Sequence, residues 1–107
     1  MSYTENSRNI PITCRSDDNL KFSVKADYDL TPYAIQLLVE TRLGIIDLSQ
    51  YCVKTDTDSF TVDIPSSVMN TLVNALRYKV AIILDGNNTD VLFGGKMIVE
   101  RGIVVWQ

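Results

Sequence analysis

The chain of 107 residues contains no histidine, which removes the most common general base of enzymes. Without histidine, neither a Ser-His-Asp nor a Cys-His arrangement can form. The most common transition-metal ligand is also missing, and the two cysteines, Cys14 and Cys52, are too few for a zinc site. No glycine-rich phosphate loop and no GxSxG elbow occurs. We therefore expect a protein that is not an enzyme and that has no catalytic residues, no metal and no cofactor.

Positive charge is also sparse, with ten Lys and Arg residues against thirteen Asp and Glu residues. The basic residues are scattered singly, whereas nucleic-acid binding depends on clustered positive charge. No apolar run approaches the roughly 18 residues of a membrane span, and the polar stretch 1–8 does not resemble a signal peptide. These features predict synthesis in a cytoplasm, with no nucleic-acid or membrane partner. In a cytoplasm the cysteines are expected to be free thiols, with a single disulfide as the alternative.

What the chain does contain is repeated alternation of apolar and polar residues. Leu20 to Ala26 alternates without a fault, which is typical of a half-buried β-strand. Tyr33 to Arg42 also fits a strand, with a helix as the alternative, and Pro11 limits the first strand to an edge. Both faces of 77–85 are largely apolar, which predicts a central strand with Leu84 on its inward face. The predicted strands are 9–14, 20–26, 33–42, 45–48, 51–54, 59–64, 77–85 and 91–101.

One segment changes to the helical period. Apolar residues predict a stripe on a helix of two or three turns, which would connect the two sheets of a sandwich. Ser66 or Ser67 is expected to cap the helix. The residues of this stripe are Val68, Met69, Leu72, Val73 and Leu76.

The order of these elements predicts one β-sandwich domain over residues 9–102. Residues 1–8 are expected to form a flexible N-terminal arm, and 103–107 an apolar C-terminal tail. The pair Gly94-Gly95 predicts a bulge or the close approach of another backbone. The acidic pairs Asp27/Asp29 and Asp56/Asp58 favour turn formation, with calcium ligation or a glycosidase pair as alternatives.

Four segments of the chain resemble a known group of proteins. They are Asp29-Leu-Thr-Pro-Tyr33 with the strand 34–40 that follows, Phe60-Thr-Val-Asp-Ile-Pro65, Arg77 to Gly86, and Val91 to Val99. They resemble the immunoglobulin-like β-sandwich structural proteins of tailed bacteriophages, which include tail-collar proteins, baseplate adaptors and head decoration domains. The resemblance implies an all-β, immunoglobulin-like antiparallel β-sandwich of about seven strands, with one short crossover helix near 66–76. It supplies no catalytic residues.

The first functional hypothesis follows from this resemblance: a structural component of a tailed-phage virion, in the tail, collar or baseplate. The protein would be made in the host cytoplasm and would assemble as a homo-oligomer, with copies of itself and other virion structural proteins as partners. The candidate contact residues are Leu38, Ile103, Val105 and Trp106.

The alternative hypotheses are a head decoration protein or a stand-alone binding module. Such a module would recognise a protein or a carbohydrate through the loops Asp27–Tyr33 and Asp85–Asp90.

Overall fold

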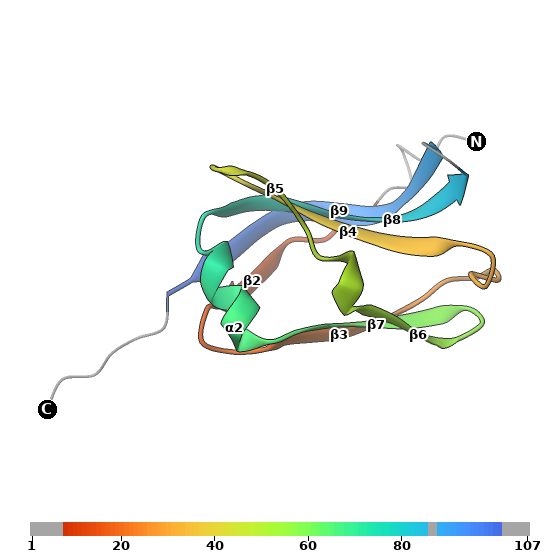
Figure 1. Ribbon diagram of the computed structural model, residues 1–107, viewed down its shortest axis with the longest axis horizontal. Helices are drawn as coiled ribbons and strands as arrows, with labels where there is room; N and C mark the ends of the chain where they lie inside the picture. Colours follow the sequence, from red (N-terminus) through yellow and green to blue (C-terminus); the bar gives the residue numbers. More distant parts are fainter. Residues whose placement is uncertain (1–7, 86–87, 102–107) are drawn as a thin grey trace, which may run out of the picture.

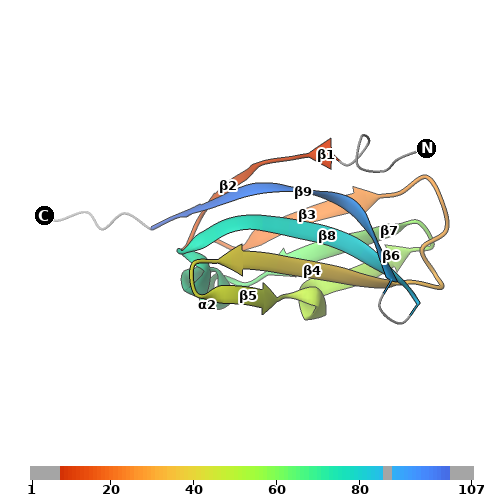
Figure 2. The same cartoon turned by 90° about the horizontal axis from the view of Figure 1, so that it is seen from above.

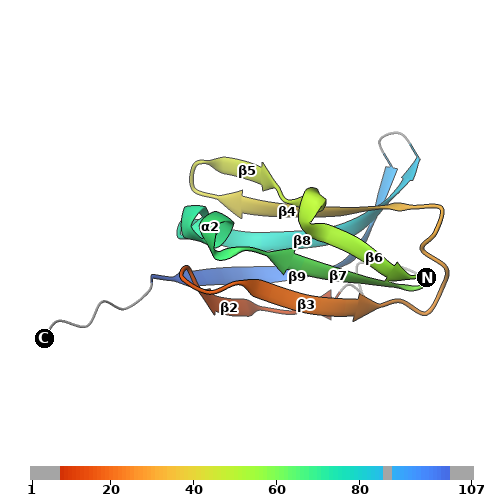
Figure 3. The ribbon, with the colours of Figure 1, turned by 60° about the horizontal axis from the view of Figure 1, so that its bottom comes forward.

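The structure is a computed structural model that describes residues 8–85 and 88–101, and these form two stacked β-sheets (Figure 1). The larger sheet has the strand order β1-β9-β8-β4-β5, with β2 also paired to β9, and the smaller sheet has the order β3-β7-β6. Figure 2 looks onto the larger sheet, and Figure 3 brings the smaller sheet forward. The strands are β1 (Arg8–Asn9), β2 (Ile12–Arg15), β3 (Leu20–Lys25), β4 (Ala34–Thr41), β5 (Gly44–Asp47), β6 (Cys52–Asp56), β7 (Ser59–Ile64), β8 (Ala75–Asp85) and β9 (Asn88–Glu100).

This arrangement confirms the predicted fold class, an all-β immunoglobulin-like sandwich. The placement of β5 beside β4 matches the variable type of this fold, in which an extra strand extends the larger sheet. The sandwich is not wholly antiparallel as predicted, because β1 and β2 pair with β9 in parallel. The predicted first strand is split at Pro11, which has no N–H for the ladder. Its edge position is confirmed.

The inward faces of both sheets form one core. Alternation places Phe60, Val62 and Ile64 of β7 inward, each at most 1% exposed. On the opposite sheet, Leu37 and Val39 of β4 are also buried, and β4 is a strand as predicted. Strand β8 lies between β9 and β4, which confirms its central position. Leu84 is 45% exposed instead of inward, because it lies where β8 runs out toward the turn and the register with β9 shifts.

The crossover between the sheets is confirmed, but the predicted helix is too long. An α-helical turn, α2 (Ser66–Met69), is followed by the 3₁₀ turn η2 (Asn70–Leu72). A second 3₁₀ turn, η1 (Ser49–Tyr51), precedes β6. Leu76 is not on a helical stripe: it belongs to β8, where pairing with β4 outweighs the helical pattern.

The predicted serine cap is also wrong. Pro65 is the N-cap residue of α2, and no side chain of the cap residue bonds to the helix. Instead, the side-chain oxygen of Asn19 accepts a hydrogen bond from the backbone N–H of Ser66 at 2.8 Å. The β2–β3 turn therefore supplies the cap from a distant part of the sequence.

Gly94 and Gly95 confirm the predicted close approach of another backbone. A Cβ atom on Gly94 would lie 2.6 Å from the carbonyl oxygen of Tyr78, and one on Gly95 would lie 2.9 Å from the carbonyl oxygen of Ile10. The register of β8 and β9 also shifts nearby, between Val80 and Ala81. The glycines thus let β9 lie between β8 and the β1–β2 edge.

Aromatic packing links the two sheets. Phe93 of β9 meets the ring of Phe22 on β3 at 6.4 Å and that of Tyr78 on β8 at 5.9 Å, both edge to face. Antibody domains use an inter-sheet disulfide to join their two sheets. Here Cys14 and Cys52 are both free, as expected. The core therefore depends on packing rather than on a covalent bridge.

Candidate functional site

The outward face of the larger sheet, hereafter the outer face, is the candidate site. Paired residues of neighbouring strands share a side of a sheet, so the register defines this face. Across β5, β4, β8 and β9, the first row is Ile45, Glu40, Arg77 and Lys96, and the second is Asp47, Leu38, Lys79 and Gly94. The short strand β5 does not reach the last two rows. Across β4, β8 and β9 these are Gln36, Ala81 and Val91, and then Ala34, Ile83 and Thr89. The view in Figure 2 looks onto this side of the larger sheet.

One half of the outer face is mainly apolar. It lies toward the start of β4 and the connection between β8 and β9. Ile83 and Val91 are half-buried, Ala81 is fully buried by its neighbours, and Leu38 forms the boundary with the other half. None of these four residues packs against the core between the sheets. Leu38, Ile83 and Val91 leave apolar area exposed on this face, and Ala81 lies beneath them.

The other half, next to the β4–β5 turn, is charged and its charges are segregated. The acidic residues Glu40 and Asp47 lie on β4 and β5. The basic residues Arg77, Lys79 and Lys96 lie on β8 and β9. We call β4 and β5 the acidic edge of this face and β8 and β9 its basic edge; the two meet between β4 and β8, and the sheet itself continues past β9 to β1 and β2.

Within the described residues, one ion pair bridges these edges. The guanidinium Nε of Arg77 lies 3.1 Å from a carboxylate oxygen of Glu40, and the two side chains are 70% and 47% exposed. At this exposure such a pair contributes at most about 1 kcal/mol. Its effect is mainly to hold the two charges in place, while Lys79 and Lys96 make no ion pair within the part of the chain that is described.

Asp47 is fixed at the end of β5 by Ser49. The backbone N–H of Ser49 donates to the Asp47 carboxylate at 2.9 Å, and the Ser49 hydroxyl donates to the same oxygen. These bonds lower the pKa of Asp47, so the acidic edge keeps this negative charge well below neutral pH.

An exposed apolar residue lies beside the acidic edge. Ile45 of β5 is 68% exposed, and Leu43 in the turn before it is 88% exposed. Gly44 between them has φ of +135°, a conformation that permits the sharp turn into β5. Because β5 is an edge strand, nothing in the described chain covers this corner.

Of the four predicted contact residues, the structure places one on this face. Leu38 points outward from the middle of β4. Ile103, Val105 and Trp106 lie outside the described residues, as do most of the predicted arm 1–8 and the tail 103–107. Sequence reasoning missed the charged residues of the site because their grouping depends on which strands pair. The only signal was the alternation that puts Arg77 and Lys79 opposite the buried residues of β8.

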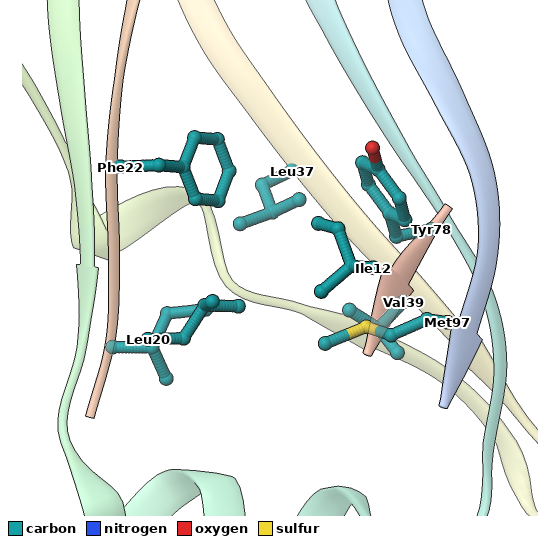
Figure 4. Close-up of a pocket in the computed structure, with 8 residues that line it drawn as sticks. Ile12, Leu20, Phe22, Leu37, Val39, Tyr78 and Met97 are labelled. Atoms are coloured by element: carbon teal, nitrogen blue, oxygen red, sulfur yellow. The ribbon is translucent and has the colours of Figure 1, made fainter. Parts of the chain in front are cut away.

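Two hollows elsewhere in the described residues are weaker candidates for a binding site. A cavity of about 10 Å³ between the sheets is lined only by apolar side chains and Tyr78 (Figure 4). This volume is at the lower limit for one water molecule. The hydroxyl of Tyr78 donates a hydrogen bond to the Ile10 carbonyl. An open polar hollow of about 390 Å³ lies beside α2, lined by Ser16, Asp17, Ser66, Ser67 and Asn70.

The cysteines and the acidic pairs form no reactive site in the described residues. Burial raises the pKa of Cys52 to about 11 and also raises that of Cys14, which disfavours the thiolate. Asp29 and Asp56 accept backbone N–H groups in turns, as the turn interpretation predicted. No group of three potential metal ligands occurs in residues 8–85 and 88–101. No helix among them is long and apolar enough to cross a membrane.

Fold and site together define an immunoglobulin-like sandwich with an apolar and charged outer face. No family model matches the sequence, and no curated protein matches it. Among solved structures, the chain is similar to the extracellular fragment of novel immune-type receptor 10 from Ictalurus punctatus, with 10% identity, a TM-score of 0.48 and coverage of 86% of this chain and 98% of that one. It is also similar to the fragment of novel immune-type receptor 11 with its stalk region, from the same fish, with 8% identity, a TM-score of 0.49 and coverage of 94% and 91%.

Proposed function

We propose that this chain is a non-enzymatic protein-interaction module that binds its partner through the outer face of the larger sheet. The observation that carries the proposal is the combination of outward apolar residues with segregated charges on one rigid surface. Apolar area supplies affinity, and an ordered charge pattern supplies orientation and selectivity. The chain has no histidine, so its chemistry suits contact better than catalysis.

The size of the face supports this role. The strands β5, β4, β8 and β9 have 4, 8, 11 and 13 residues. At about 3.3 Å per residue and about 4.8 Å between strands they make a face of roughly 570 Å². A specific interface buries about 800 Å² on each partner. Side chains make the accessible area of a sheet larger than its flat outline, so the face is comparable to what one partner domain of similar size covers.

For the assembly in which the module works, we keep the hypothesis from the sequence. The resemblance to tailed-phage structural proteins supports a virion component of the tail, collar or baseplate, made in the host cytoplasm and contacting other virion proteins. A head decoration protein uses the same kind of contact.

Recognition through the end loops is the second candidate function. The hydrogen bond from Leu30 N–H to the Thr57 carbonyl at 2.6 Å favours this candidate, because the bond fixes the loop 27–33 against the β6–β7 turn.

The test compares two matched exposed residues on edge strands. Ile45 of β5 is 68% exposed on the outer face, and Val53 of β6 is 59% exposed on the smaller sheet. Immobilised wild type, Ile45→Asp and Val53→Asp are used to capture partners from the cell that makes the protein, after circular dichroism has confirmed that all three fold. We expect a partner held by wild type and Val53→Asp and lost by Ile45→Asp. Equal capture by all three would contradict the proposal.

A further inference from the structure

We infer that the partner on the outer face is a second copy of this chain, docked about a two-fold axis that runs along the strands between β4 and β8. This inference rests on the proposed function and names the occupant of the same surface. It is carried by the distribution of charge and apolar area on the face, which is complementary to itself in one orientation only.

The charges decide the direction of the axis. A two-fold axis along the strands exchanges the left and right edges of the face, so β5 of one copy lies over β9 of the other and β4 lies over β8. Glu40 then lies over Arg77 of the second copy in the same row, and Asp47 lies one row away from its Lys96. An axis across the strands would instead put each strand over itself and reverse the order of the rows, so that no acidic residue would meet a basic one.

The apolar half leads to the same orientation. An axis along the strands keeps each row of the face at its own height, so the apolar half of one copy covers the apolar half of the other. Because β4 lies over β8, Ile83 would then lie over Ala34 of the second copy. An axis across the strands would put Ile83 over Arg77 and Ala81 over Lys79 of the second copy, leaving charges desolvated over apolar surface. Both criteria therefore select the axis along the strands.

The neighbouring charges do not disturb this arrangement. Arg42 lies in the β4–β5 turn, at the end of the face rather than on it. Glu100 lies near the end of β9, beyond the stretch paired with β8, where it pairs with Arg15 of β2. The surface is isologous, with the same patch used by both copies, and such a contact closes at a dimer.

The inference is tested by two variants that repel themselves and attract each other. Lys96→Glu would place an acid against the acidic edge of its copy. Ile45→Lys would place a cation against Lys96 of its copy, because Ile45 and Lys96 lie in the same row at opposite edges. In a mixture of the two variants, the lysine introduced on β5 of one chain would face the glutamate introduced on β9 of the other. Lys25→Glu, an exposed charge reversal on the outward side of β3, is the matched control.

Dimerisation is measured by sedimentation velocity and native mass spectrometry from about 1 to 200 μM, a range that brackets the affinity of a modest interface. We expect wild type and Lys25→Glu to dimerise with the same Kd. Lys96→Glu and Ile45→Lys should each raise Kd at least about tenfold, and their equimolar mixture should form heterodimers with nearly wild-type affinity.

Three results would overturn the inference: a wild type that stays monomeric throughout, single variants that dimerise as well as wild type, or a mixture no more associated than its components. Each can be distinguished from failure of the proposed function. A monomeric wild type whose partner capture is still lost in Ile45→Asp removes the second copy as occupant and leaves the outer face as a binding surface.

Discussion

The two outward faces of this sandwich differ in chemistry although both come from strands with the same alternation. The outward side of the smaller sheet is polar except for Val53 on its edge strand: Lys21 lies opposite Asp63 in the register, and the hydroxyls of Ser23 and Thr61 lie 3.1 Å apart. The outer face of the larger sheet instead carries Leu38, Ile83 and Val91 beside its charges. Opposite charges lie across from each other in register on the first face. On the second face the acidic residues lie on β4 and β5 and the basic ones on β8 and β9, where the two groups meet in the Glu40–Arg77 ion pair.

This difference indicates which face is suited to contact with water and which to contact with a partner. Directly paired opposite charges and hydroxyls satisfy one another within a sheet, so they leave little to attract a partner. Segregated charges leave an acidic and a basic edge that another molecule can pair, and the outward apolar residues add area that is better buried. The following changes test this comparison, from the largest expected effect to the smallest.

The largest effect should come from comparing two truncations on one strand, the first of an inward-facing residue and the second of its outward-facing neighbour. Leu37 of β4 is 2% exposed in the core, whereas its neighbour Leu38 points outward and is half-buried. Leu37→Ala should lower the free energy of unfolding by about 2–5 kcal/mol because it opens a cavity. Leu38→Ala should cost less than about 1.5 kcal/mol and should mainly weaken association. Urea unfolding measures the first, and sedimentation the second. Equal losses of stability would show that Leu38 belongs to the core.

The next effect concerns the close approach of two backbones in the larger sheet, where β9 passes β8 at Gly94. Gly94→Ala would bring a methyl group within 2.6 Å of the Tyr78 carbonyl oxygen, and backbone atoms cannot move aside as a flexible side chain can. We expect a loss of about 1–3 kcal/mol in urea unfolding. Gly44→Ala is the companion change, because it meets no atom within 4 Å and is opposed only by its φ of +135°. A cost of about 1 kcal/mol is expected there. A harmless Gly94→Ala would contradict the close packing of β9 on β8.

A smaller effect should distinguish the two thiols, one on each sheet. Burial raises the pKa of Cys52 on β6 from 9.0 to about 11. The thiol therefore contributes stability that is complete below pH 9 and is lost as the pH rises to about 11, since the unfolded chain gives up its proton first. Cys52→Ala should flatten the fall in unfolding free energy over this range, and Cys14→Ala on β2 should flatten it less. Urea unfolding from about pH 8 to 11 checks both, and an unchanged slope in Cys52→Ala would contradict the burial.

Much of the fold follows from the sequence because alternation is a local signal. The strands β3 and β7 have nearly the predicted bounds, since each buries every second side chain regardless of its partners. The end of α2 and the parallel pairing of β2 were not predicted, because they depend on contacts with β4 and β9 that are distant in sequence. The same limit applies to the site. Leu38 stands out as an apolar residue among polar ones, whereas the acidic and basic edges exist only once Glu40, Arg77 and Lys96 are placed in one row.

The smallest effect should come from substitutions on the outward side of the smaller sheet. They test whether apolar area alone is enough to create a binding surface. Ser23→Ala with Thr61→Val replaces the exposed hydroxyl pair of β3 and β7 with apolar side chains of similar shape. Because both partners are removed together, the unfolding free energy should change by no more than about 0.5 kcal/mol. The double variant should also dimerise no more than wild type, because the face around it has Lys21 opposite Asp63 and offers no segregated charge. New self-association in sedimentation velocity would show that apolar area is sufficient, and the charge pattern of the outer face would then lose its role in selecting the partner.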